Sequence, residues 1–133
     1  MKVDYLYEKI KVKADFYDNV NLLYDMSGAG KTFFFEIMKS YCKENNIKYS
    51  AFDFVSDNSE NKILESTKGD EIIILDNADL YIDKNLLNKL KENCGCILIS
   101  LKSCYKIEMK DVGMYSVNYV DKKLEVKRDE SFW

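Results

Sequence analysis

Histidine and proline are both missing from this 133-residue sequence, and arginine occurs only once, at Arg128. The lack of histidine excludes zinc sites that use histidine ligands. A single arginine disfavours an enzyme that binds several phosphates in bidentate fashion, because the planar guanidinium group of arginine is the side chain suited to that geometry. No apolar run approaches the ~20 residues that a membrane-spanning helix needs, so we expect no membrane association.

No proline, low-complexity segment or repeat marks a linker, so we expect a single domain over residues 1–133. Apolar residues make up 47% of the chain and charged residues 32%, a balance that is typical of globular domains. The first residues lack the uninterrupted apolar stretch of a secretory signal. These features together predict a cytoplasmic protein.

The charges also lack a basic excess: 20 basic residues stand against 23 acidic ones, for a formal net charge of −3. Neutralising phosphates supplies most of the affinity of nucleic-acid binders, so this balance disfavours nucleic acid as a direct ligand. Four cysteines are present, but the Cys94–Cys96 spacing is shorter than that of usual zinc sites. We expect reduced, mostly buried thiols.

Apolar patterning predicts alternating strands and helices through most of the chain. Short apolar runs predict buried strands at 20–24, 49–55, 72–75 and 96–100. Helical spacing and capping residues predict helices at 31–43, 57–66 and 83–93. Residues 5–16 predict an edge strand or hairpin, and 114–126 predict two strands joined by a turn. This order predicts an α/β three-layer sandwich, with a mainly parallel sheet and an antiparallel edge hairpin.

A glycine-rich segment follows the first buried strand and opens the first predicted helix. Its residues are Asp25, Met26, Ser27, Gly28, Ala29, Gly30, Lys31 and Thr32. Glycines let the backbone approach a phosphate closely, and a helix N-terminus directs N–H groups and a positive dipole towards it. Lys31 can reach the terminal phosphates, and the Thr32 hydroxyl can bind Mg²⁺.

This segment resembles the Walker A loop of P-loop NTPases, whose pattern is G-x-x-x-x-G-K-[ST]. Gly30, Lys31 and Thr32 match the end of that pattern, whereas Asp25 replaces its first glycine. A carboxylate beside a triphosphate weakens binding unless it points away. The resemblance implies that residues 25–32 bind ATP, or another nucleoside triphosphate, together with Mg²⁺.

A second motif supports this interpretation. Asp76 directly follows the apolar run 72–75, and this arrangement resembles the Walker B motif, which places Asp76 beside Mg²⁺. The number of residues between Lys31 and Asp76 resembles the spacing of the two motifs in the additional-strand division of the superfamily, which includes the AAA+ ATPases. The resemblance then makes the strand that ends at Ser100 a sensor strand between the two motif strands, with Ser100 near the γ-phosphate or the attacking water.

The position after Asp76 departs from those families, which commonly have a glutamate there. Asn77 can orient a water molecule but cannot accept its proton. Asp79 and Asp53 are the acidic residues that could replace the missing base. The resemblance thus implies catalytic roles for Asn77, Asp79 and Ser100.

Two functions remain open. The intact residues Lys31, Thr32 and Asp76 favour an ATP-binding protein with weak hydrolysis, stimulated by a protein partner or by a second copy that lends an arginine. Asn77 and the single Arg128 favour a degenerate P-loop module that binds and regulates, or inhibits, another protein without catalysis. The small size and lysine-rich composition would suit a module of mobile-element or phage origin.

Overall fold

The structure is a computed structural model that describes residues 1–24, 28–53, 59–101 and 112–129. The strands of these ranges are β1 (Lys2–Tyr7), β2 (Ile10–Asp15), β3 (Val20–Leu23), β4 (Tyr49–Phe52), β5 (Ile72–Leu75), β6 (Ile97–Ser100), β7 (Gly113–Val120) and β8 (Lys123–Arg128). The helices are α1 (Gly28–Glu44), α2 (Glu60–Ser66), the 3₁₀ helix η1 (Ala78–Leu80) and α3 (Lys84–Asn93). Within these ranges, none of the helices combines the length and the apolar character needed to cross a membrane.

All of these strands belong to one sheet, in the spatial order β1-β2-β8-β7-β3-β6-β5-β4. The strands β7, β3, β6, β5 and β4 run parallel to their neighbours in that half of the sheet. The pairs β1–β2 and β7–β8 are antiparallel hairpins. A parallel pairing between β2 and β8 joins the two hairpins, so the sheet is mixed and continuous.

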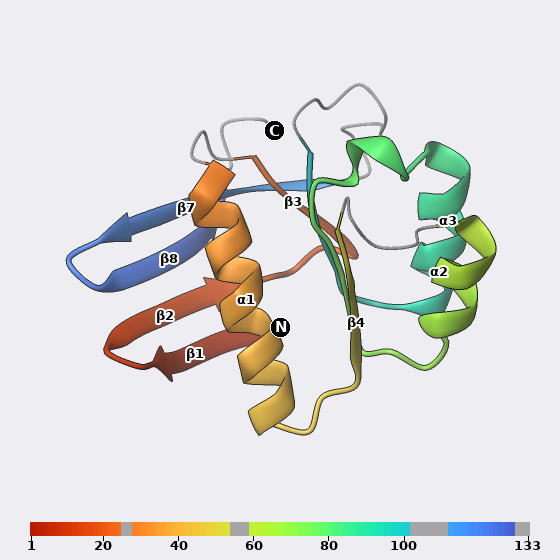
Figure 1. The fold of residues 1–133 in the computed structure, drawn as a ribbon. Coiled ribbons are helices and arrows are strands. Elements are labelled where there is room, and N and C mark those ends of the chain that lie inside the picture. The colour runs from red at the N-terminus through yellow and green to blue at the C-terminus, as the bar shows by residue number, and fades with distance from the viewer. Residues whose placement is uncertain (25–27, 54–58, 102–111, 130–133) are drawn as a thin grey trace.

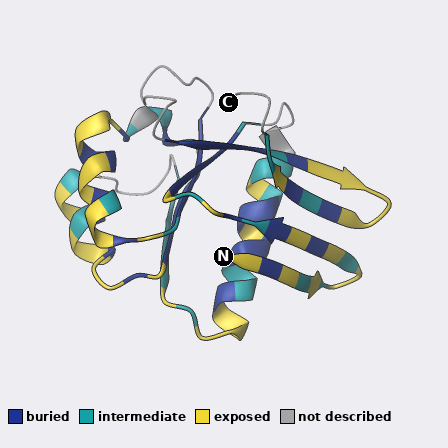
Figure 2. Ribbon diagram, turned by 180° about the vertical axis from the view of Figure 1, so that it is seen from behind, coloured by how far each residue is buried: buried dark blue, intermediate teal, exposed yellow. Residues whose placement is uncertain are grey.

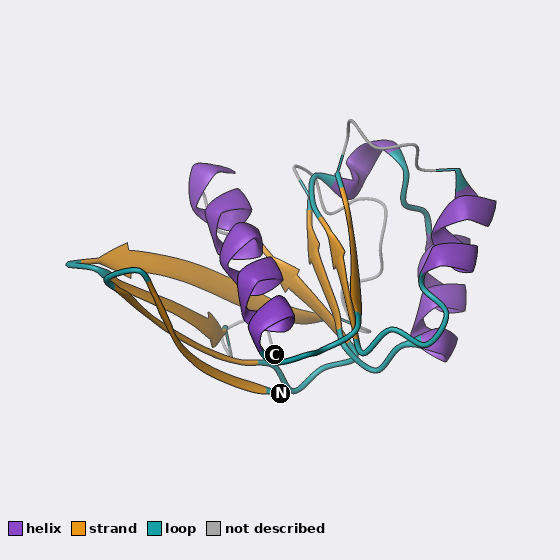
Figure 3. Ribbon diagram, turned by 60° about the horizontal axis from the view of Figure 1, so that its bottom comes forward, coloured by secondary structure: helices purple, strands orange, loops and turns teal. Residues whose placement is uncertain are grey.

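The predicted three-layer sandwich, with a mainly parallel sheet and an edge hairpin, is therefore wrong. The hairpins make up half of a mixed, eight-stranded sheet that curls like a half-barrel around α1 (Figures 1 and 3). The long strand β7 explains the difference. It pairs with β3 only from Gly113 to Tyr115, and it then continues past β3 as the partner of β8. Because β8 also pairs with β2, the N-terminal hairpin becomes part of the same sheet.

The inner face of the curl buries the apolar side of α1. Figure 2 shows buried and exposed residues alternating along the hairpin strands, as expected when one face is covered and the other meets solvent. Buried side chains from α1 and from the sheet form one cluster: Val3, Val12, Ala14, Phe16, Leu23, Phe34, Phe35, Ile37, Met38, Cys42, Ile72, Ile74, Leu98, Tyr115, Val117, Leu124 and Val126. Both hairpins thus contribute to the core.

The other face of the parallel strands is covered by α2 and α3 (Figure 1). Every residue of β3, β5 and β6 is buried, which is typical of strands covered on both faces. Asp83 caps α3 as predicted, since its carboxylate accepts a hydrogen bond of 2.7 Å from the Leu86 N–H. Apart from Asn21, which hydrogen-bonds to the Asp18 and Ile97 carbonyl oxygens, the side chains inside these strands are apolar, and Ser100 is polar at the end of β6.

A polar junction fixes the C-terminal hairpin to the loop before β3. Arg128 Nε lies 2.9 Å from Asp18 Oδ2, and the Tyr115 hydroxyl donates to the same oxygen at 2.8 Å. The Tyr17 N–H in turn donates to the Tyr115 hydroxyl at 3.0 Å. Gly113 leaves the space for this carboxylate, because a Cβ at position 113 would overlap Asp18. Glycine is therefore required at position 113 because a side chain there would clash with Asp18, and not because of its backbone angles.

We predict that Gly113→Ala lowers the free energy of unfolding by about 2 kcal/mol, because the added methyl group forces Asp18 away from Arg128 and Tyr115. Gly95→Ala is the matched control, since a Cβ there meets no atom within 4 Å. Urea denaturation measures both. In an Asp18→Ala background, Gly113→Ala should lower the free energy of unfolding by much less. An equally large loss in that background would show that disruption of the junction does not cause the destabilisation.

Candidate functional site

Asp76 is the first residue after β5, and both oxygens of its carboxylate accept hydrogen bonds from other elements. Thr32 Oγ1 donates to Oδ2 at 3.1 Å, and Ser100 Oγ donates to Oδ1 at 2.7 Å. Asp76 is only 9% exposed, so these two donors compensate for much of the water that its carboxylate has lost. The carboxylate thereby connects the first turns of α1 with the ends of β5 and β6.

The described residues of the glycine-rich segment form the start of α1, which is the next element after β3. Gly28, Ala29 and Gly30 open α1, and Lys31 and Thr32 follow in the same helix. The predicted phosphate-binding residues Asp25, Met26 and Ser27 lie outside the described residues. The order of strand, glycine-rich segment and helix along the chain is therefore the one that the motif requires, and the first N–H groups of a helix have no partner within the helix itself.

Ser100 ends β6, which pairs with β3 on one side and with β5 on the other. This position agrees with the sequence prediction that the strand ending at Ser100 lies between the two motif strands. Ser100 is 1% exposed, and its hydroxyl accepts a hydrogen bond of 2.9 Å from the Asn77 N–H while it donates to Asp76. Its hydrogen bonds thus fix the turn that follows β5.

Asn77 adopts a left-handed backbone conformation, with φ 48° and ψ 53°. Asparagine tolerates this conformation better than most residues, which accounts for its place in the turn. The main chain of Asn77 is engaged by Ser100. Asp79 follows on η1, so the structure places both predicted catalytic residues in the turn after β5.

Tyr81 belongs to this site, although sequence reasoning did not single it out. Its hydroxyl lies 2.7 Å from the Asp76 carbonyl oxygen and 3.2 Å from that of Phe52, so it connects the ends of β5 and β4. Burial raises the pKa of Tyr81, and the nearby carboxylates raise it further, which keeps the hydroxyl protonated as a donor. An isolated tyrosine after a turn carries no sequence signal for this role.

A small cavity of about 60 Å³ opens beside Thr32 and Asp76, between α1 and the ends of β4 and β5. Asp53 lines it together with these two residues, so one of the two acidic residues suggested as a base reaches the same space. Glu36 also lines the cavity, but its carboxylate is paired with Lys39 at 2.9 Å. The cavity has room for a water molecule or an ion.

The residues around this cavity fit Mg²⁺. The Thr32 hydroxyl and the Asp76 carboxylate are oxygen ligands, and Mg²⁺ usually binds proteins through one or two such groups while phosphates and water fill the other positions. In the part of the chain that the structure describes, no three or more His, Cys, Asp or Glu gather to hold a metal by themselves. Thr32 and Asp76 are the residues that would hold the ion.

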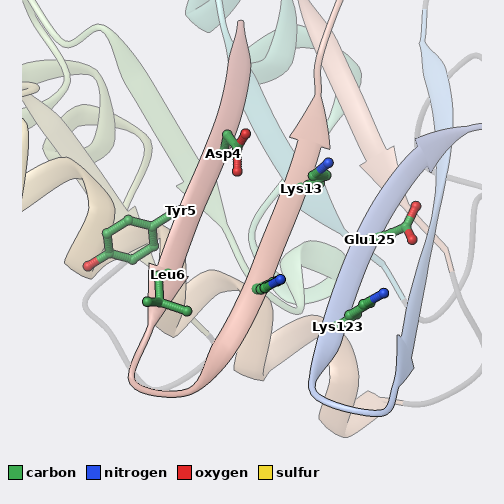
Figure 4. Close-up of a pocket in the computed structure, with 7 residues that line it drawn as sticks. Asp4, Tyr5, Leu6, Lys13, Lys123 and Glu125 are labelled. Atoms are coloured by element: carbon green, nitrogen blue, oxygen red, sulfur yellow. The ribbon is translucent and has the colours of Figure 1, made fainter.

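A wider cavity of about 570 Å³ lies on the outer face of the hairpins (Figure 4). Its lining residues are Asp4, Tyr5, Leu6, Lys11, Lys13, Lys123 and Glu125. None of the site residues predicted from the sequence is among them. Lysines and carboxylates stand side by side there, which is typical of a solvated sheet face rather than of a site selective for anions.

The described thiols Cys42 and Cys96 have raised pKa values, and Arg128 pairs with Asp18. Burial raises the pKa of Cys42 to about 11 and that of Cys96 to about 12, so these thiols are poor nucleophiles. Cys104 lies outside the described residues. Arg128 is bound to Asp18, which precedes β3, whereas the glycine-rich segment follows it. The guanidinium is therefore engaged in the polar junction with Asp18.

Comparison with known proteins adds no assignment. No protein-family model matches the chain, and a search of curated proteins found no match. A functional conclusion therefore depends on the geometry around Asp76 and on the residues of the two motifs.

We predict that Ser100→Ala lowers the free energy of unfolding by about 2 kcal/mol, because it leaves a buried Asp76 oxygen and the Asn77 N–H without their partner. Ser50→Ala is the control, since the Ser50 hydroxyl makes its hydrogen bond at an exposed position. This substitution should lower the free energy of unfolding by under about 1 kcal/mol. Chemical denaturation of both variants measures the difference. Equal losses would mean that Ser100 contributes no more than a surface hydroxyl.

Proposed function

We propose that this protein binds a nucleoside triphosphate, with ATP as the first candidate, together with Mg²⁺, and that it hydrolyses the nucleotide weakly or only with a partner. The phosphates would bind to residues 25–32, and Thr32 and Asp76 would hold the ion. This proposal places the chain with the P-loop NTPases and its action in the cytoplasm.

The observation that carries the proposal is the hydrogen-bonded chain from Thr32 through Asp76 to Ser100. Thr32 and Asp76 are 44 positions apart, and Ser100 lies a further 24 positions along the sequence. Each belongs to a different motif or strand that the phosphate-loop hypothesis singles out. A chance glycine turn before a helix gives no reason for these three side chains to meet.

The chain's own groups have clear roles in this arrangement. The first N–H groups of α1 and the ammonium group of Lys31 would bind the phosphate oxygens, because they bring positive charge to one small region. Mg²⁺, when bound, would neutralise charge on the terminal phosphates. Asp76 and Thr32 would orient the ion, while Ser100 and Tyr81 hold Asp76 in place.

A second candidate function is a degenerate module that binds another protein and performs no catalysis. Two observations favour it. Asn77 offers no basic oxygen, and its left-handed backbone suits asparagine better than the glutamate that commonly stands there. Arg128 is paired with Asp18, which also accepts a hydrogen bond from Tyr115. An arginine for the transferred phosphoryl group would therefore have to come from a partner or from a second copy of the chain.

We predict that millimolar Mg²⁺ and ATP raise the melting temperature of the protein. At about 100 times Kd, mass action adds ~2.7 kcal/mol to the folded state, which is roughly 10 °C in a chain of this size. Lys31→Ala should abolish the shift, whereas Lys43→Ala, in the last turn of α1, should preserve it. Differential scanning fluorimetry gives both values. A shift that survives Lys31→Ala would place the nucleotide elsewhere.

A second experiment separates the ATPase from the non-catalytic module. Asn77→Glu should raise the rate of phosphate release at least tenfold. General-base catalysis contributes about 10²–10⁴-fold to a rate, and the left-handed backbone at position 77, which glutamate tolerates less well, reduces that gain. Asn77→Gln is the matched control, since glutamine has the same size and the same backbone strain but no basic oxygen. Equal rates for the two variants would favour the module without catalysis.

A further inference from the structure

Three aromatic rings form a partly exposed cluster beside the first turns of α1. The ring centroid of Phe33 lies 6.2 Å from that of Tyr7 and 6.1 Å from that of Tyr119, and both pairs meet edge to face. Phe33 and Tyr7 are half-buried, whereas Tyr119 is 48% exposed. We call these three residues the aromatic cluster. An exposed tyrosine of this size is not needed to fill the core.

The curl of the sheet brings these rings together. Tyr7 ends β1 and Tyr119 lies near the end of β7, and the strands β2 and β8 separate them in the sheet. Both rings nevertheless reach Phe33, because the sheet wraps around α1 (Figure 3). The half-barrel that the sequence did not predict thus creates a surface of its own beside the helix.

The aromatic cluster and the Asp76 site lie on different sides of the start of α1. Thr32 is hydrogen-bonded to Asp76, directly after β5, whereas its neighbour Phe33 contacts the hairpins. Successive helical residues point about 100° apart, which accounts for this division. Phe33 is five positions after Gly28, or roughly 7.5 Å along the helix axis. A nucleotide whose terminal phosphate lies by Asp76 has its nucleoside at the other end.

We propose that the aromatic cluster binds the base of the nucleotide, which stacks on the exposed ring of Tyr119. This inference rests on the proposed function, because it takes the phosphate position from the Asp76 site. Stacking recognises the flat face that every base has, and not the donors and acceptors on its edge. The cluster therefore binds adenine and guanine nucleotides with similar affinity, and it adds affinity that a bare triphosphate lacks.

Calorimetric titration of the full chain with three magnesium complexes tests this inference: ATP, GTP and inorganic tripolyphosphate. Tyr119→Leu should weaken ATP and GTP binding about tenfold, a typical loss for one stacked base, and should leave tripolyphosphate binding unchanged. Tyr119→Phe should retain the wild-type affinities, because it keeps the ring. Tyr17→Leu is the matched control, since Tyr17 is 65% exposed but stands before β3.

The outcomes distinguish this inference from the proposal beneath it. If ATP and tripolyphosphate bind the wild type equally, or if Tyr119→Leu weakens all three ligands alike, the base-stacking role is overturned while phosphate binding stands. If none of the three ligands binds, both proposals fail. Circular dichroism of each variant checks that it is folded, and an effect of Tyr17→Leu as large as that of Tyr119→Leu would also overturn the inference.

Discussion

The buried carboxylate of Asp76 is the constraint on which the rest of the site depends. A negative charge that is 9% exposed requires partners, and it finds them in Thr32 on α1 and Ser100 on β6. The backbone carbonyl of the same residue accepts from Tyr81. One residue thus fixes the start of α1, the ends of two strands and the turn after β5. These hydrogen bonds hold the parts of the site in fixed positions relative to one another.

The sheet divides the protein into two parts with different tasks. The short strands β3, β5 and β6 are buried throughout and mostly apolar, with Asn21 as a polar residue inside β3 and Ser100 at the end of β6, so their side chains build most of the core. The hairpins alternate between buried and exposed residues, and they provide the inner wall against which α1 packs (Figure 2). The start of α1 lies where these two parts meet, so Thr32 contacts Asp76 after β5 while its neighbour Phe33 contacts the hairpins.

The sequence was sufficient to predict the parts of the fold that depend on local patterns. The run 72–75 and the Asp83 cap were predicted because strand burial and helix capping depend on neighbouring residues. The meeting of Thr32, Asp76 and Ser100 could be anticipated only from the motif resemblance, which supplies the strand order.

The curled sheet could not be predicted in this way. The parallel pairing of β2 with β8 joins Lys11 to Lys123, and two alternating strands contain no signal that they will become neighbours. Tyr81 and Tyr119 were missed for a related reason. Their roles come from tertiary contacts, with the ends of β4 and β5 in one case and with Phe33 in the other.

The pairing of β2 with β8 also bears on how the chain folds during synthesis. The hairpin β1–β2 leaves the ribosome before the other strands described, but β8, which joins it to the rest of the sheet, is made after all of them. Until then the apolar side of α1 lacks β7 and β8 as cover. Pairings between distant segments form slowly, and apolar surface exposed in the meantime promotes aggregation. The yield of folded protein should therefore depend on how quickly the last hairpin closes over the helix.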